Sequence, residues 1–135
     1  MPIVVDASVT ISWFFGAERI PSVEDLWDEV SGSGVVVPTI WSYEVANRLG
    51  RSLTAGEIPA TEVAAFFAML ETLQPVTVQP SLTALVARMT ATGLTACDAA
   101  YLDVAAARGL ALATLDRRLR EAAAQAGIAV LPESF

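Results

Sequence analysis

The chain has 135 residues, 54% of them hydrophobic, and a formal net charge of −7, so it has apolar material for one domain and no overall basic field to attract nucleic acid. It contains no histidine and no lysine, which excludes Ser-His-Asp and Cys-His relays, imidazole metal ligands, P-loop lysines and lysine Schiff bases. The chemistry that remains is that of carboxylates, which in a cleft usually bind hard divalent cations such as Mg²⁺ or Mn²⁺.

Short aliphatic runs alternate with longer helical stretches along the whole chain. Strands are predicted at Ile3–Val5, Val35–Val37, Val76–Val78, Leu110–Ala113 and Ile128–Leu131. Helices are predicted at Ser8–Phe15, Ser22–Val30, Thr39–Leu53, Thr61–Leu73, Ser81–Ala91, Ala96–Arg108 and Arg117–Ala126. This rhythm is typical of an α/β fold with a buried parallel sheet. Because no linker, low-complexity tract or repeat interrupts it, we expect residues 1–135 to form a single domain.

Glycine, proline and threonine mark several of these boundaries. Gly109 and Gly127 each stand where a helix would end in a left-handed cap before a short apolar strand. Pro38 can open the helix that follows it. Thr95, followed three residues later by Asp98, reads as an N-cap with an acid in the first helical turn, where the helix dipole favours it.

Two aspartates follow predicted strands directly. Asp6 closes the first strand, and Asp116 comes shortly after the strand that ends at Ala113. The carboxyl edge of an open α/β sheet is where ligands bind, so both carboxylates are candidates for a functional site. Either aspartate alone could equally serve only as a helix N-cap.

Two further acids lie in helices. Glu44 lies on a polar helix face, where an i,i+4 pair with Arg48 is the structural alternative, worth only about 0.3 to 0.5 kcal/mol. Asp98 is a lone charge entering an apolar helix, so its burial would require a partner or a cation. Asp103, turned about 140° from Asp98 around the helix, is predicted to be a surface or interface residue.

Together the four acids, Asp6, Glu44, Asp98 and Asp116, predict a shared site. Converging carboxylates repel one another unless cations neutralise them. Two ions about 3.5 to 4 Å apart could hold a phosphodiester, activate a water for in-line attack and stabilise the leaving oxygen. The hydroxyls of Ser8 and Thr114 could orient the neighbouring carboxylates, although caps or backbone hydrogen bonds would be equally natural for them.

The negative net charge argues against a nucleic-acid substrate, but bound cations would invert the local potential of an acidic cleft. The arginines also gather near the acids. The candidates for phosphate contacts along the rim are Arg48, Arg51, Arg117 and Arg118. Solvated helix faces are the alternative reading of these arginines.

The single cysteine, Cys97, cannot form an internal disulfide, which agrees with a reducing compartment. The chain reaches Asp6 too early for a signal peptide, and no apolar run approaches the ~18 residues of a membrane helix, so we expect a cytoplasmic protein. The mean hydropathy of +0.53 is high for a monomer of this size. We therefore expect another subunit or a partner to cover part of the apolar surface.

With these motifs in this order, the chain resembles a PIN-domain protein, and more narrowly the VapC type of toxin ribonuclease. The segments that carry the resemblance are Asp6-Ala7-Ser8-Val9, Trp13-Phe14-Phe15, Glu44-Val45-Ala46-Asn47, Thr95-Ala96-Cys97-Asp98-Ala99-Ala100-Tyr101-Leu102 and Ala113-Thr114-Leu115-Asp116. No single segment is specific, whereas the ordered set spans nearly the whole chain. Cys97 stands where such proteins often carry a tyrosine.

The resemblance implies a three-layer α/β/α sandwich with a mostly parallel sheet, a carboxylate-bound Mg²⁺ or Mn²⁺ centre, and endonucleolytic cleavage of RNA. It implies that Asp6, Glu44, Asp98 and Asp116 take the family's acidic positions, with Ser8 and Thr114 as supporting hydroxyls. Our hypothesis is that Asp6, Asp98 and Asp116 hold the cations, and that Glu44 holds a second ion or orients a water. The resemblance also implies a VapB-like antitoxin that covers the pocket, and a toxin homodimer.

Two other functions remain open on the sequence. A catalytically inactive PIN-like domain could act only as a protein-binding module, although the intact acidic set argues against this. A receiver-like or phosphatase-like domain could use Asp6 as a phosphoacceptor. Such domains normally need a lysine near the acyl phosphate, and this chain has none.

Overall fold

The computed structural model describes residues 1–16 and 21–134, and its strands form one five-stranded sheet in the order β3-β2-β1-β4-β5. The strands are β1 (Ile3–Val5), β2 (Val35–Pro38), β3 (Val76–Val78), β4 (Leu112–Ala113) and β5 (Val130–Leu131). Every neighbouring pair is parallel. The parallel sheet predicted from the aliphatic runs is therefore confirmed. Strands β1, β2 and β4 are buried, whereas the edge strand β3 is largely exposed.

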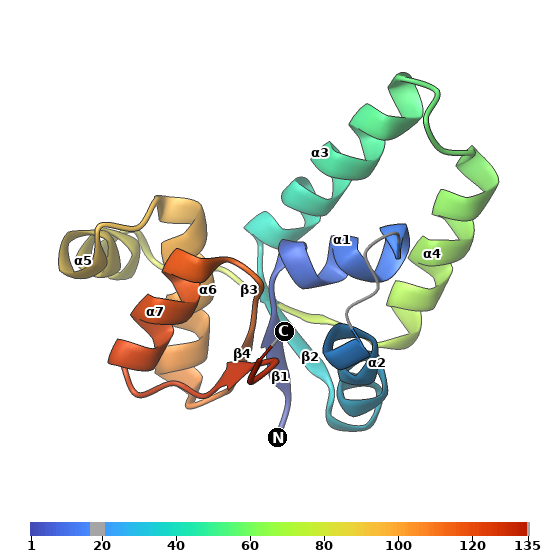
Figure 1. Cartoon of the computed structure of the whole chain (residues 1–135). Helices are drawn as coiled ribbons and strands as arrows, with labels where there is room; N and C mark the ends of the chain where they lie inside the picture. The colour runs from blue at the N-terminus through green and yellow to red at the C-terminus, as the bar shows by residue number, and fades with distance from the viewer. Residues whose placement is uncertain (17–20, 135) are drawn as a thin grey trace.

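Helices cover both faces of the sheet (Figure 1). Those on one side are α1 (Ala7–Phe15), α2 (Pro21–Ser33), α3 (Ile40–Thr54) and α4 (Ala60–Thr72), and those on the other are α5 (Leu82–Thr92), α6 (Ala96–Arg108) and α7 (Arg117–Gln125). The three-layer α/β/α sandwich is confirmed. The prediction that Pro38 opens a helix is wrong, because Pro38 ends β2 and pairs with Val78, and Thr39 precedes α3.

The core follows from the two-residue period of the strands. Ile3 and Val5 point into a cluster with α1, α2, α3 and α4, while Val4 joins a second cluster with α6 and α7 on the opposite face. Val35 to Val37 divide between the two clusters in the same way. Strands buried on both faces need apolar residues at every position, which explains the continuous aliphatic runs.

The strand order reverses between β1 and β4, which form the topological switch point of the sheet. From β1 the chain adds β2 and then β3 on one side, and it returns through α5 and α6 to place β4 on the other side. The backbone N–H of Asp6 donates to the carbonyl of Ala113 at 3.0 Å, which holds the ends of β1 and β4 together. Such a switch point is where open α/β sheets form ligand crevices.

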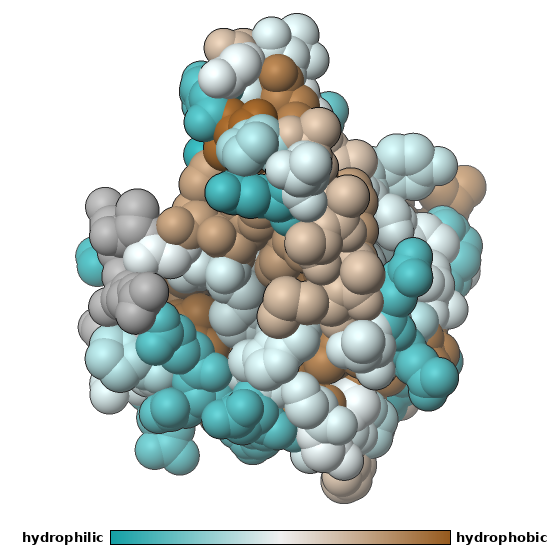
Figure 2. All heavy atoms as spheres, turned by 90° about the vertical axis from the view of Figure 1, so that its right-hand side faces the viewer, coloured by the Kyte–Doolittle hydropathy of each residue, from teal (hydrophilic) through white to brown (hydrophobic). Residues whose placement is uncertain are grey.

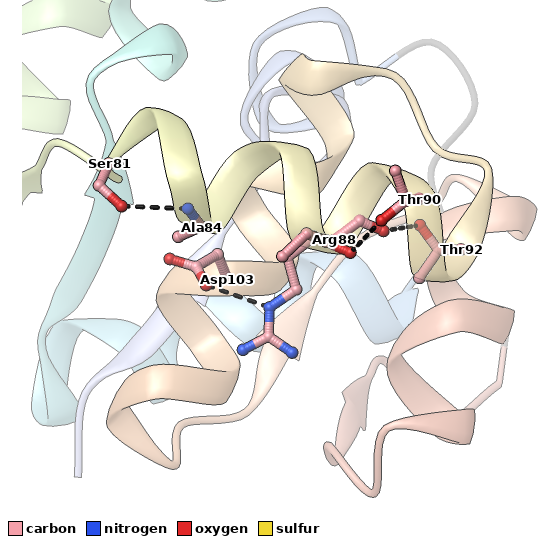
Figure 3. Close-up of polar contacts among 7 residues, drawn as sticks. Ser81, Ala84, Arg88, Thr90, Thr92 and Asp103 are labelled. Carbon is pink, nitrogen blue, oxygen red and sulfur yellow. Dashed lines mark hydrogen bonds and ion pairs between the residues drawn. The ribbon is translucent and has the colours of Figure 1, made fainter.

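Helix α5 lies on the surface and is joined to α6 by an ion pair (Figure 3). Its N-cap Ser81 accepts a hydrogen bond from the Ala84 N–H at 3.1 Å. Arg88 reaches from α5 to Asp103 on α6, with Nε and Oδ1 3.1 Å apart. The Asp103 side chain is 15% exposed, so the residue predicted to lie at the surface or an interface is partly covered by α5 and paired with Arg88.

No helix among residues 1–16 and 21–134 has the length and apolar character needed to cross a bilayer.

Removing the Arg88–Asp103 pair is expected to loosen α5. We expect Asp103→Asn and Arg88→Met each to lower the free energy of unfolding by roughly 0.5 to 1 kcal/mol, because the pair is partly shielded from solvent. Urea unfolding of both variants and of the double variant measures the coupling between the two side chains. Additive single effects would show that the pair contributes nothing to stability.

Candidate functional site

Asp6 is the most buried of the predicted site acids, with 5% of its surface exposed at the end of β1. Its Oδ1 accepts hydrogen bonds from the Ser8 hydroxyl at 2.6 Å and the Val9 N–H at 3.1 Å. The Thr114 hydroxyl donates to Oδ2. The carboxylate therefore caps α1, which is the alternative role that the sequence allowed for Asp6. It is also held by Thr114, a residue distant in sequence that follows β4.

The two supporting hydroxyls connect this carboxylate to the β4–α7 turn. Ser8 Oγ accepts a hydrogen bond from the Leu115 N–H at 3.0 Å, and Thr114 Oγ1 accepts one from the Asp116 N–H at 3.0 Å. Asp116 in turn caps α7, because its Oδ1 accepts from the Leu119 N–H at 3.0 Å. Ser8 thus donates to Asp6 and accepts from the opposite turn, whereas Thr114 donates to Asp6 across the two turns and accepts within its own turn. Together the two hydroxyls hold the turns next to each other.

Burial sets the protonation behaviour of Asp6. Desolvation raises the pKa of its carboxyl from 3.8 to about 6, and the nearby negative charge of Glu44 adds to the rise. The hydrogen bonds from Ser8, Thr114 and Val9 act in the opposite direction, since they favour the ionised form. The effect of desolvation on the pKa is larger than the combined effect of the three hydrogen-bond donors. Ionising Asp6 in the folded chain therefore costs free energy.

Glu44 is positioned by a tyrosine that the sequence analysis did not select. The Tyr101 hydroxyl on α6 donates to Glu44 Oε1 on α3 at 2.6 Å. Tyr101 is 2% exposed. Burial, followed by the hydrogen bond to Glu44 and then the charge of Glu44, raises the pKa of Tyr101, so it remains a proton donor. A signal was present, because Tyr101 lies three residues after Asp98 on the same helix and therefore on a similar face.

Asp98 lies half-buried in the first turn of α6, behind the predicted N-cap Thr95, whose hydroxyl accepts from the Asp98 N–H at 3.4 Å. Burial raises the pKa of Asp98, and the charges of Asp116 and Glu44 raise it further. The Arg118 guanidinium acts against this rise. Asp98 is thus close enough to feel both of these acids electrostatically.

The predicted acids therefore form a chain of electrostatic neighbours. Asp6 is coupled to Glu44, Glu44 to Asp98, and Asp98 to Asp116. No three aspartate, glutamate or cysteine side chains within residues 1–16 and 21–134 are close enough together to hold one metal ion. The structure brings the four charges into one region, but it does not form a closed cage of ligands.

This donor set fits a hydrated dication. Mg²⁺ takes oxygen ligands, keeps several of its waters and is commonly held by only one or two carboxylates. Neighbouring carboxylates such as Glu44 and Asp98 offer such donors, and their mutual repulsion would fall when a cation binds. Histidine and lysine, which favour other kinds of site, are absent from the chain.

Of the two predicted rim arginines on α7, Arg118 lies nearer the acids. Its charge lowers the pKa of Asp98, and its Nη2 donates to the Gly93 carbonyl at 3.3 Å. Arg117 is exposed at the first position of α7. Both follow Asp116 directly in the sequence, at the start of α7.

The two predicted rim arginines on α3 make internal contacts. The Arg48 guanidinium stacks 4.3 Å from the centre of the Phe15 ring and donates to Ser52 Oγ at 2.5 Å. Arg51 donates from Nε to the Asn47 carbonyl at 3.3 Å. Arg48 thus joins α3 to α1 by a cation–π contact, in addition to any contact it makes with a ligand.

The comparison with known families decides the classification. A model of the PIN domain matches residues 3–125. The chain belongs to the PIN-domain family. PIN domains are typically metal-dependent nucleases, and the family generally binds divalent metal ions. The acids at the switch point of the sheet are therefore where family chemistry would be expected.

Solved structures of the same fold agree. PAE2754 from Pyrobaculum aerophilum superposes with a TM-score of 0.72 at 23% identity, over 96% of this PIN domain and 83% of that chain. FitAcB from Neisseria gonorrhoeae gives a TM-score of 0.64 at 21% identity, over 95% of each chain. No curated protein matches the sequence significantly. At these identities the two structures support the fold alone.

The raised pKa of Asp6 predicts a stability that depends on pH. Because the pKa is about 6 in the folded chain and 3.8 as the reference value, ionisation costs on the order of 3 kcal/mol above pH 6, and this cost fades as the pH falls toward 4. We expect Asp6→Asn to remove this cost and so to stabilise the protein at pH 8. The gain should be at least about 1 kcal/mol but less than the full cost of ionisation, because the amide loses part of the hydrogen bonding. Its advantage should shrink toward pH 4.5.

Urea unfolding in EDTA at pH 8, 6 and 4.5 measures this difference without bound metal. Asp28→Asn, which removes one exposed negative charge from α2, is the matched control. A stability difference between Asp6→Asn and the parent protein that stays constant across this range would contradict the assigned origin of the shift.

Proposed function

We propose that this PIN domain is a Mg²⁺- or Mn²⁺-dependent endoribonuclease that acts as the toxin of a toxin–antitoxin pair. The main support is the buried Asp6 carboxylate at the switch point of the sheet, retained at a cost in stability and coupled through Glu44 to Asp98 and Asp116. Perturbed carboxyls of this kind gather at functional sites. The nuclease character of the family supports the same conclusion.

In this proposal Asp6, Asp98 and Asp116 hold the cation or cations, and Glu44 holds a second ion or orients a water. A bound Mg²⁺ or Mn²⁺ would supply activation of the attacking water and stabilisation of the leaving oxygen. The protein supplies orientation: Tyr101 fixes one oxygen of Glu44, which remains half-buried on α3.

Other residues would complete the site. Ser8 and Thr114 keep both oxygens of Asp6 in place through their hydroxyls. Arg117 and Arg118, beside the acids, are the stronger candidates for contacts to the RNA phosphates. Arg48 and Arg51 would extend these contacts along α3, on the rim of a groove of about 660 Å³ that they both line.

The proposed protein partners are a VapB-like antitoxin and a second copy of the chain. Exposed apolar side chains support a protein partner. Figure 2 shows apolar residues gathered on the α3–α4 side of the molecule, where Phe67 and Met69 are 39% and 51% exposed. An apolar pocket of about 280 Å³ lies between these helices and is lined by Trp41, Val45 and Leu70 among others. Surface of this kind marks interaction sites.

The first test uses Asp98→Asn with purified protein and single-stranded RNA in Mn²⁺. We expect the variant to lose at least about 100-fold in cleavage rate, because a carboxylate in a metal site contributes several kcal/mol to the transition state. Asp103→Asn is the matched control, since it makes the same change on the same helix at the Arg88 ion pair. Equal cleavage by Asp98→Asn and the parent protein would remove Asp98 from the site.

A second readout separates metal binding from folding. Mn²⁺ at about 100 times its dissociation constant should stabilise the parent protein by about 2.7 kcal/mol, visible as a rise in Tm, and should stabilise Asp98→Asn less. Circular dichroism spectra of the two proteins in EDTA should coincide. A metal response with no cleavage of any RNA would favour the inactive protein-binding module.

The toxin role is tested in cells. We expect induction of the chain to arrest growth and to create discrete new RNA ends, and co-expression of the small protein encoded beside its gene to relieve both effects. Mapping of RNA ends with and without the neighbour, and with Asp98→Asn in place of the parent chain, measures this. Growth arrest without new RNA ends would exclude cleavage of RNA as the cause.

A further inference from the structure

A pocket of about 210 Å³ opens between α3, α6 and the connection from β3 to α5. Thr39, Ile40 and Tyr43 line it from the start of α3, and Ala96, Cys97 and Ala100 line it from the start of α6. Gln79, Pro80 and Leu85 complete the wall. Its size, below the roughly 300 Å³ of the smallest typical ligand pockets, suits one ring system and not an extended molecule.

The pocket adjoins the acidic site. Tyr43 is the residue before Glu44, and Cys97 is the residue before Asp98, so on each helix an acid directly follows a residue of the pocket wall. The hydrogen bond from Tyr101 to Glu44 joins the same two helices. Burial raises the pKa of Cys97 in the pocket wall, and the charges of Glu44 and Asp98 raise it further, so a group bound in the pocket would lie near these two carboxylates.

The lining is neutral. None of the described residues that form the pocket carries a charge at pH 7, and Ile40, Leu85 and Ala100 make much of it apolar. Phosphate would find no cation here, and the adjacent carboxylates would repel it. A neutral, flat and partly apolar group fits better.

Two side chains suit a flat group with a polar edge. Tyr43 lines the pocket and is 71% exposed as a residue, so its aromatic ring is available for stacking. The Gln79 amide is held in place, because its Oε1 accepts from the Thr39 hydroxyl at 2.5 Å and its Nε2 donates to the Pro80 carbonyl at 3.3 Å. An amide can offer both a donor and an acceptor to the edge of a base.

We propose that this pocket binds one unpaired base of the RNA next to the cleaved phosphate, and that Tyr43 and Gln79 set the nucleotide preference of the site. This inference rests on the proposed function. Tyr43 stacks on the base and Gln79 hydrogen-bonds its edge, a common mode of recognition of single-stranded RNA. Because the space holds one base, paired RNA does not fit and the substrate is single-stranded at this position.

The test measures cleavage of an RNA with a random central segment in Mn²⁺, with sequencing of the new ends. The parent protein should prefer certain bases at one position beside the cut. Tyr43→Ala should raise KM about 5- to 150-fold, equivalent to the stacking energy of one base, and should flatten the preference. Gln79→Ala should change which bases are preferred.

Two variants serve as controls. Tyr43→Phe retains the ring and should retain both KM and the preference. Leu82→Ala truncates a side chain of α5 that is 82% exposed and does not line the pocket, so it should behave like the parent protein. An unchanged base preference in both Tyr43→Ala and Gln79→Ala would overturn the proposal.

A binding experiment separates this inference from the proposed function. Calorimetric titration with the four nucleoside 5′-monophosphates and with ribose 5-phosphate, in Mn²⁺, tests the pocket without cleavage. At least one nucleotide should bind the parent protein at least about 5-fold more tightly than ribose 5-phosphate, and Tyr43→Ala should remove this difference. If this holds while no RNA is cut, the nuclease proposal fails and the pocket assignment stands.

The opposite results also decide the matter. If RNA is cut but nucleotides bind no better than ribose 5-phosphate, the pocket assignment is wrong and the nuclease proposal stands. A lower sedimentation coefficient of Tyr43→Ala, together with an unchanged cleavage profile, would identify this face as a contact between copies of the chain and would also overturn the proposal.

Discussion

The burial of one carboxylate at the end of β1 is the constraint on which the rest of the molecule depends. Asp6 has almost no contact with solvent, so its charge must be supported by the chain, and the supporting hydroxyl of Thr114 comes from the far side of the sequence. The hydrogen bonds from Thr114 to Asp6 and from the Leu115 N–H to Ser8 place the β1–α1 and β4–α7 turns next to each other. The core strands thus fix the position of Asp6, and burial of its charge lowers the free energy of unfolding that the core provides.

A tyrosine–carboxylate contact joins the two outer layers at the same edge. Glu44 belongs to α3 on one face of the sheet, while Tyr101 belongs to α6 and packs in the core of the other face. The position of Glu44 therefore depends on how well α6 is packed. A mutation in that core would alter the acidic site without contacting it, which makes packing and function inseparable here.

The elements of this fold could be predicted from the sequence because strands buried on both faces produce continuous aliphatic runs, and glycine caps end the helices at Gly109 and elsewhere. Asp6 and Asp116 could be identified as candidates because each follows one of these aliphatic runs in the sequence. The Tyr101–Glu44 bond could not, because its partners are 57 residues apart and meet only through helix packing. For the same reason the pairing of Arg88 with Asp103 was not foreseen.

Arg120 ties the segment around β5 to the edge of the sheet where Asp6 lies. Its Nη1 donates to the Thr114 carbonyl at 2.7 Å and to the Leu131 carbonyl at 3.2 Å, and its Nη2 donates to the Pro132 carbonyl. The residue whose hydroxyl holds Asp6 is thus clamped to the last strand. Affinity tags or reporter fusions attached after β5 would strain this clamp, whereas Met1, 83% exposed, offers a tolerant point for attachment.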